Sequence, residues 1–187
     1  MRALSSLGRH RALAGASVVA VVAIVFVAVL ATRSTAPGTV APSHLLGRPA
    51  PEVAGRDLVN GRPVSLSDLH GKYVVVDFFA SWCSPCLTEA PQLERFLFTH
   101  RKRNDAAVLG VVYGDSSANA RAFLRRIGAS WPAVSDPGYA IALHFGVDDP
   151  PQSFVVAPSG RVIARVVGGV TAAELDRIVS SSKLAST

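Results

Sequence analysis

Residues 72–80 (KYVVVDFFA) are almost continuously apolar and predict a β-strand that is buried on both faces. A strand of this kind needs helices on both sides of its sheet, so the surrounding chain must alternate strands with helices. Helical spacing is found over residues 85–103, 117–127, 137–145 and 171–182. Further strands are predicted over residues 106–113, 131–134, 152–157 and 162–167. The order predicts an α/β domain with a central mixed sheet flanked by helices.

Two short extended segments, residues 51–53 and 62–66, precede this sheet. Asn60-Gly61 lies between them, and Asn-Gly is a strong signal for a tight turn. The sequence therefore predicts a β-hairpin at the N-terminal side of the domain.

The N-terminal part of the chain has a different character. Residues 12–32 contain no charged side chain and are long enough to cross a bilayer as a helix, which needs about 20 apolar residues. Basic residues precede this run, so residues 1–11 are expected in the cytoplasm and the rest of the chain outside. A cleaved signal peptide ending near Val29-Leu30-Ala31 is the alternative. Residues 33–47 are interpreted as a flexible spacer, and residues 48–187 as the folded domain.

The formal charge of +6 does not indicate nucleic-acid binding. Four of the 19 basic residues and none of the 13 acidic residues lie before Ser34, so the rest of the chain is nearly balanced. The dense basic cluster Arg101-Lys102-Arg103 is expected at the C-terminal end of a helix, where cations complement the helix dipole.

Trp82-Cys83-Ser84-Pro85-Cys86 lies where the buried strand ends and a helix begins. A thiol at a helix N-terminus has a lowered pKa, and the thiolate is the species that attacks disulfides. Cys83 is therefore expected to be the exposed nucleophile, and Cys86 the more buried thiol that resolves the mixed disulfide. A structural bridge and half of a zinc site are alternatives, but zinc normally needs four ligands and a bridge this short constrains the unfolded chain little. Leu87 after Cys86 excludes a haem-attachment motif. The sequence predicts no metal, and no cofactor beyond a redox-active Cys83–Cys86 disulfide.

Two carboxylic acids are candidates for proton transfer. Asp77 lies within the apolar strand, so burial should raise its pKa and allow it to exchange a proton with Cys86. Glu89 lies one helical turn after Cys86 and is either a second acid–base group or a solvated helix residue. An Asp77 side chain directed to solvent at a strand edge is the alternative for the first acid.

Asp149-Pro150-Pro151 enters a predicted strand. X–Pro peptide bonds adopt the cis form far more often than other peptide bonds, and cis-prolines typically lie in tight turns. The alternative is a rigid loop.

Together these segments resemble the thioredoxin superfamily. VDFFASWCSPC (Val76 to Cys86) is similar to its active-site segment, and WCSPCLTEAP (Trp82 to Pro91) resembles the WCxPCxxExP pattern of membrane-anchored TlpA/ResA/DsbE (CcmG)-like thiol–disulfide oxidoreductases. FGVDDPPQSFVV (Phe145 to Val156) resembles the segment that holds their cis-proline.

The resemblance implies a thioredoxin-like fold with the N-terminal hairpin and a helix–strand insertion, and it places Pro151 at the cis-proline. Trp82, Pro150 and Pro151 would contact the substrate. The implied partners are a protein disulfide, often in apocytochrome c, and a transmembrane thiol electron donor, with the catalytic domain on the extracytoplasmic side of the cell membrane.

Three positions depart from the pattern. Asp77 stands where the group often has Asn, and Asp149 replaces a common Gly. Pro150 has no N–H to offer to a substrate backbone.

Three functions remain compatible with the sequence. The first is a disulfide reductase in cytochrome c maturation. The second is a thiol oxidase or isomerase for exported proteins, and the third is a non-catalytic metal-binding module. The reduction potential separates the first two, and retained metal without turnover would indicate the third.

Overall fold

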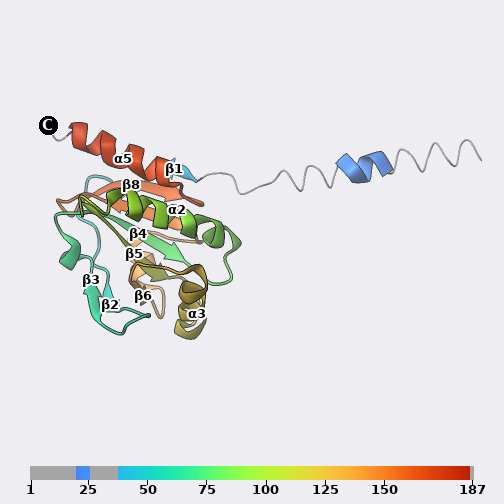
Figure 1. Cartoon of the computed structure of the whole chain (residues 1–187), viewed down its shortest axis with the longest axis horizontal. Helices are drawn as coiled ribbons and strands as arrows, with labels where there is room; N and C mark the ends of the chain where they lie inside the picture. Colours follow the sequence, from blue (N-terminus) through green and yellow to red (C-terminus); the bar gives the residue numbers. More distant parts are fainter. Residues whose placement is uncertain (1–19, 26–37, 186–187) are drawn as a thin grey trace, which may run out of the picture. The chain divides into compact units, whose positions relative to one another are not determined.

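The computed structural model describes residues 20–25 and 38–185 (Figure 1). Residues 20–25 are helical, with exposed apolar side chains. Within these two ranges no helix has both the length and the apolar character required to cross a bilayer. The predicted cytoplasmic segment 1–11 and most of the predicted anchor 12–32 lie outside the described residues, so both remain predictions.

A six-stranded mixed sheet forms the centre of the domain, in the order β1-β8-β7-β4-β5-β6. Strand β4 pairs in parallel with β5 and antiparallel with β7, so the predicted mixed sheet is confirmed. The strands of this sheet are β1 (Thr39–Ala41), β4 (Tyr73–Phe79), β5 (Ala106–Val112), β6 (Ala133–Ser135), β7 (Gln152–Val156) and β8 (Val162–Val167).

The helices begin and end at residues suited to those positions. Helix α2 (Ser84–His100) has Pro85 in its first turn, where the missing N–H has no partner to lose. Helix α3 (Ser117–Ile127) is capped by Ser116, whose hydroxyl accepts the N–H of Asn119. Thr171 Oγ1 likewise accepts the N–H of Glu174 at the start of α5. Within residues 38–185 the remaining helices are the 3₁₀ turn η1 (Ser67–Leu69), α4 (Ala140–Phe145) and α5 (Ala172–Ala185).

The alternation of side chains along β4 divides the core between the two faces of the sheet. Val74, Val76 and Phe78 belong to the cluster that includes α4. Val75 points the other way and packs with apolar residues of α2 and α5. Asp77 is two residues after Val75, so its side chain points to the same face of the sheet, toward the helix that carries the two cysteines.

The hairpin is confirmed, with a shift in its first strand. Strand β2 (Ala54–Arg56) pairs with β3 (Pro63–Ser65), and Asn60-Gly61 lies in the connection. The first strand lies after the predicted residues 51–53 because Val53 is fully buried in the core, where its carbonyl accepts the N–H of Leu66.

The predicted spacer over residues 33–47 is wrong in its described part. Strand β1 lies within it and pairs antiparallel with β8, and Leu45 is buried. A three-residue edge strand has too little periodicity to be read from sequence, and its hydrogen bonds depend on β8, which is more than 120 residues away in the chain. The folded domain therefore begins before residue 48.

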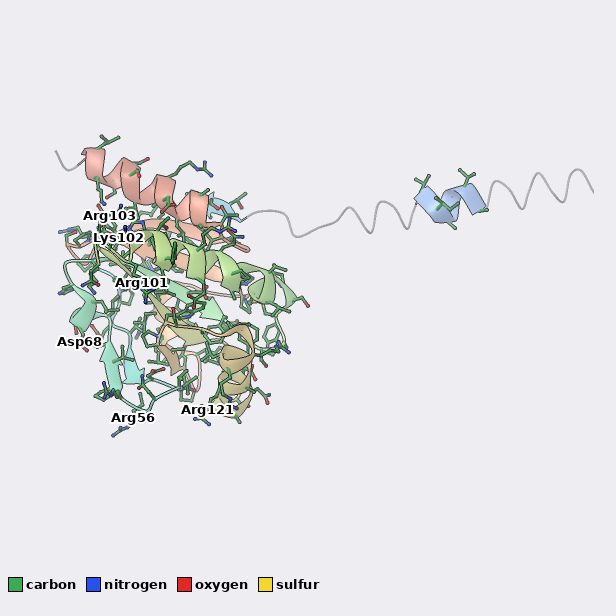
Figure 2. The ribbon with its side chains drawn as sticks, in the orientation of Figure 1. Arg56, Asp68, Arg101, Lys102, Arg103 and Arg121 are labelled. Atoms are coloured by element: carbon green, nitrogen blue, oxygen red, sulfur yellow. A yellow bond between two sulfur atoms is a disulfide. The ribbon has the colours of Figure 1, made fainter. Side chains whose placement is uncertain are left out.

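The basic cluster Arg101-Lys102-Arg103 follows the C-terminal end of α2, as predicted (Figure 2). The last residue of the helix, His100, is buried and joins two other elements. Its Nδ1 lies 2.6 Å from Asp105 Oδ1, and its Nε2 lies 3.0 Å from Asp176 Oδ1 on α5. These contacts hold the end of α2 against α5 and the start of β5.

Truncation of Phe78 should be among the most destabilising changes in the core. Its ring is fully buried, with its centroid 5.2 Å from that of Phe145 and 6.1 Å from that of Phe154. The Phe78→Ala variant is expected to lose about 3–5 kcal/mol of unfolding free energy, because it loses apolar burial and leaves a cavity. Chemical denaturation measures this loss. The control Phe98→Ala removes a ring that is 73% exposed and should change stability by no more than about 0.5 kcal/mol. Equal losses in the two variants would contradict this account of the core.

Candidate active site

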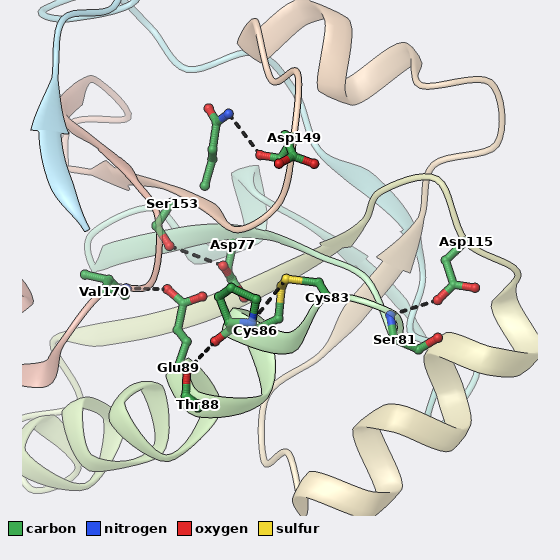
Figure 3. The surroundings of a disulfide bond; sticks show 12 residues. Asp77, Ser81, Cys83, Cys86, Thr88, Glu89, Asp115, Asp149, Ser153 and Val170 are labelled. Carbon is green, nitrogen blue, oxygen red and sulfur yellow. Dashed lines mark hydrogen bonds between the residues drawn. A yellow bond between two sulfur atoms is a disulfide. The ribbon is translucent and has the colours of Figure 1, made fainter. Parts of the chain in front are cut away.

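Cys83 and Cys86 form a disulfide at the N-terminus of α2 (Figure 3). Cys83 is the N-cap residue, and its Sγ accepts the backbone N–H of Cys86 at 3.2 Å. Cys86 lies in the first turn of the helix. The unpaired N–H groups of this turn favour negative charge, so a thiolate at Cys83 is stabilised once the disulfide opens.

The expected difference in exposure between the two cysteines is not observed. Cys83 is 4% exposed and Cys86 is 3% exposed, and both belong to an apolar cluster with Phe79 and Phe123. The Cα atoms of the two residues are 5.4 Å apart at the start of the helix, and in the oxidised state both side chains lie against the same core. The prediction that Cys83 is exposed is therefore wrong for this state, and its assignment as the nucleophile rests on its N-cap position.

Asp77 is buried on the face of β4 that is covered by α2, as the sequence predicted. The register of the sheet pairs Asp77 with Ser153 on β7, and the Ser153 hydroxyl donates to Asp77 Oδ1 at 3.2 Å. Asp77 and Cys86 line the same small cavity beneath the disulfide. The alternative of a solvent-directed side chain at a strand edge is excluded.

Glu89 is also buried, so the alternative of a solvated helix residue is wrong. Its Oε1 accepts the backbone N–H of Val170 at 2.9 Å, from the loop that leads into α5 (Figure 3). Its Oε2 has no hydrogen-bond partner among the described residues. A buried carboxyl oxygen without a donor disfavours the charged form of the acid.

The two acids influence each other's protonation. Burial raises the pKa of Asp77 to about 7, although the Ser153 hydrogen bond opposes this shift. Burial raises the pKa of Glu89 well above its ordinary value, and the nearby charge of Asp77 raises it further. Two neighbouring carboxyl groups in the interior do not both ionise readily, so the pair keeps a proton available near neutral pH. A group with a pKa near 7 is well suited to exchange protons with a thiol.

The predicted substrate-contact residues occupy two loops. Trp82 is 56% exposed, and its Nε1 donates to the carbonyl oxygen of Gly114 at 3.2 Å. The Pro150–Pro151 peptide bond is cis, as the resemblance implied, and both prolines are buried. The Pro151 carbonyl accepts the N–H of Gly168 at 3.0 Å, which joins this loop to the one before α5. The role of Trp82, Pro150 and Pro151 in binding substrate remains a prediction.

The sequence patterns did not identify two residues that support the site, Ser153 and Asp115. Ser153 bonds Asp77 only because of the register between β4 and β7, which no local pattern reveals. Asp115 Oδ2 accepts the backbone N–H of Ser81 at 2.9 Å and so fixes the turn before Trp82. The sequence signal for Asp115 was an aspartate two residues after the end of a predicted strand, in a loop where Asp side chains often bind backbone N–H groups.

Comparison with known proteins agrees with this geometry. The model of the AhpC/TSA family matches residues 46–165, which is more than half of the chain. The chain belongs to the AhpC/TSA family. The chain is also 35% identical over 132 residues to the thiol:disulfide interchange protein HelX of Rhodobacter capsulatus, an alignment that covers 70% of this chain and 72% of HelX. It is 31% identical over 125 residues to the thiol-disulfide oxidoreductase ResA of Bacillus subtilis, covering 67% of this chain and 69% of ResA.

The fold of this AhpC/TSA protein also matches a solved structure. A thiol:disulfide interchange protein of the thioredoxin family from Chlorobium tepidum superposes with a TM-score of 0.64 at 29% identity, covering 75% of this chain and 98% of that one. The domain is therefore thioredoxin-like, and this member of the AhpC/TSA family is a protein thiol–disulfide oxidoreductase.

Proposed function

We propose that this oxidoreductase is anchored to the cell membrane by residues 12–32 and reduces disulfides of apocytochrome c on the extracytoplasmic side. The observation that carries the proposal is Glu89, which is buried beside Asp77 beneath the disulfide. Glu89 is the acid of the WCxPCxxExP pattern, by which the chain resembles the membrane-anchored reductases of cytochrome c maturation. The uncharged run 12–32 with basic residues before it supports the anchor and its orientation.

The geometry gives each residue a step in the reaction. The Cys83 thiolate attacks one sulfur of the substrate disulfide, which forms a mixed disulfide and releases the other substrate sulfur as a thiolate. Cys86 then gives its proton to Asp77 and attacks Cys83 Sγ. The Cys83–Cys86 bond forms, and the second substrate thiolate leaves. Two electrons pass from the dithiol to the substrate, and a transmembrane thiol donor restores the dithiol.

Trapping with a Cys86→Ala variant in the native membrane tests this proposal. Without the resolving thiol, the mixed disulfide at Cys83 should persist, because nothing attacks it from within the active site. The expected trapped partners are proteins that carry the haem-attachment pattern C-x-x-C-H. The control is the double variant Cys83→Ala/Cys86→Ala, which should trap nothing.

Two outcomes would contradict the proposal. One is a set of trapped proteins that contains exported disulfide proteins but no cytochrome. The other is a reduction potential near that of DsbA (about −120 mV) rather than near that of thioredoxin (about −270 mV). Such a potential would indicate the oxidase that the sequence left as an alternative.

A further inference from the structure

A small cavity lies beneath the disulfide, between β4, α2 and α3, and both Asp77 and Cys86 line it. Its volume is about 10 Å³, which is close to the space that one water molecule requires. Only three of the residues around it carry polar side-chain atoms, namely Asp77, Cys86 and Trp131. A water molecule in a protein interior needs two to four polar partners, and these three side chains can supply them.

Trp131 brings an unsatisfied donor to this region. It lies just before β6 and is 5% exposed, and its indole nitrogen is buried without a hydrogen-bond partner among the described residues. A buried N–H without a partner is costly, and most such groups in native proteins bond to protein or to ordered water. The mechanism described above leaves this donor without a role.

The position of Trp131 restricts what its N–H can bond. Trp131 also lines an open pocket with Asp57 and Arg62, but its indole nitrogen is buried, so solvent in that pocket does not reach it. Apart from Asp77 and Cys86, its neighbours around the cavity are apolar. A water molecule shared with those two residues is the partner that the site can accommodate.

We propose that Trp131 is a positioning residue for proton transfer between Cys86 and Asp77, because its indole N–H holds one water molecule in the cavity that they share. During resolution of the mixed disulfide, the Cys86 thiol gives its proton to the water, and the water gives one of its own to the Asp77 carboxylate. The thiol becomes a thiolate, the carboxylate becomes a carboxylic acid, and the water is unchanged. The proposal rests on Asp77 as the proton acceptor.

The Trp131→Phe variant tests this role, because it removes the N–H and keeps most of the apolar volume. The rate at which the mixed disulfide resolves is expected to fall about tenfold, the effect of one lost hydrogen bond to a charged group. The midpoint of the pH profile of this rate is expected to move to higher pH, because without the water held by Trp131 the Asp77 carboxylate loses a donor that favours its charged form. Single-turnover kinetics with a protein disulfide measure both, and the first step, attack by Cys83, should keep its rate.

The matched control is Ile127→Val, which enlarges the same cavity by one methylene and keeps the donor. It should leave the pH midpoint in place. An equal midpoint shift in both variants would overturn the proposal, since cavity size rather than the N–H would then be responsible. The pH dependence of mixed-disulfide resolution could also stay unchanged in Trp131→Phe and disappear in Asp77→Asn. That result would overturn the role of Trp131 and leave Asp77 as the proton acceptor.

A measurement on the unaltered protein does not depend on the folding of a variant. The chain has two tryptophans, Trp82 and Trp131, so two indole N–H resonances are expected from ¹⁵N-labelled protein. The Trp131 resonance should show magnetisation transfer to a long-lived buried water. Absence of that transfer would overturn the proposal.

Discussion

A Cys83→Ser variant is expected to reduce no disulfide above the uncatalysed rate, whereas Cys86→Ser should react once with substrate and then stop. Cys83 is the N-cap residue of α2, and its sulfur receives the N–H of Cys86, so this sulfur is the one that the helix stabilises as a thiolate. Cys86 lies within the first helical turn, against the cavity that it shares with Asp77. The two thiols therefore have different tasks, although the disulfide form buries both equally.

An aromatic disulfide that releases a coloured thiolate measures this difference. Wild-type protein, re-reduced in each cycle, should release thiolate continuously. The Cys86→Ser variant should release one equivalent and retain a mixed disulfide that mass spectrometry detects at residue 83. A single equivalent released by Cys83→Ser instead would reverse the assignment of nucleophile and resolving thiol.

Replacing Asp77 with Asn is expected to slow resolution of the mixed disulfide by about 100-fold at pH 7. General acid–base groups contribute about 10²–10⁴ in rate, and the low end applies because Glu89 offers a second buried carboxyl group. The wild-type rate should rise with pH through the pKa of Asp77, which burial raises to about 7, and this titration should be lost in the variant. The control Asp68→Asn alters an exposed acid on η1 and should keep the wild-type profile. An Asp77→Asn profile that still rises with the wild-type midpoint would show that another group accepts the proton.

The same variant should also be more stable at neutral pH. Between the ordinary pKa of 3.8 and the raised value of about 7, the unfolded chain releases the Asp77 proton while the folded protein keeps it. The unfolded state then binds fewer protons, so the unfolding free energy falls as pH rises, by up to about 1.4 kcal/mol per pH unit. Asn removes this contribution, whereas Glu89, whose pKa burial also raises, still contributes a slope of the same sign. Denaturation of the oxidised protein between pH 4 and pH 8 measures the slope, and an unchanged slope would mean that Asp77 titrates normally.

Patterns confined to neighbouring residues were sufficient for much of the fold. The apolar run 72–80 predicted β4, which forms over Tyr73–Phe79. The Asn60-Gly61 turn signal placed the hairpin connection, and helical spacing over residues 171–182 placed α5. The redox motif and the raised pKa of Asp77 also followed from sequence, because a helix N-terminus after a strand and an acid among apolar neighbours are both local features.

The structure was needed wherever contacts join distant parts of the chain. Strand β1 exists only by pairing with β8, and Ser153 reaches Asp77 only through the register of β4 with β7. Glu89 was equally consistent with a solvated or a buried position until the loop at Val170 was seen to cover it. The exposure of Cys83 was predicted incorrectly because it depends on how the disulfide packs against Phe79 and Phe123. Local sequence determines backbone preference and the intrinsic chemistry of each side chain, whereas burial and pairing depend on which distant residues fold against it.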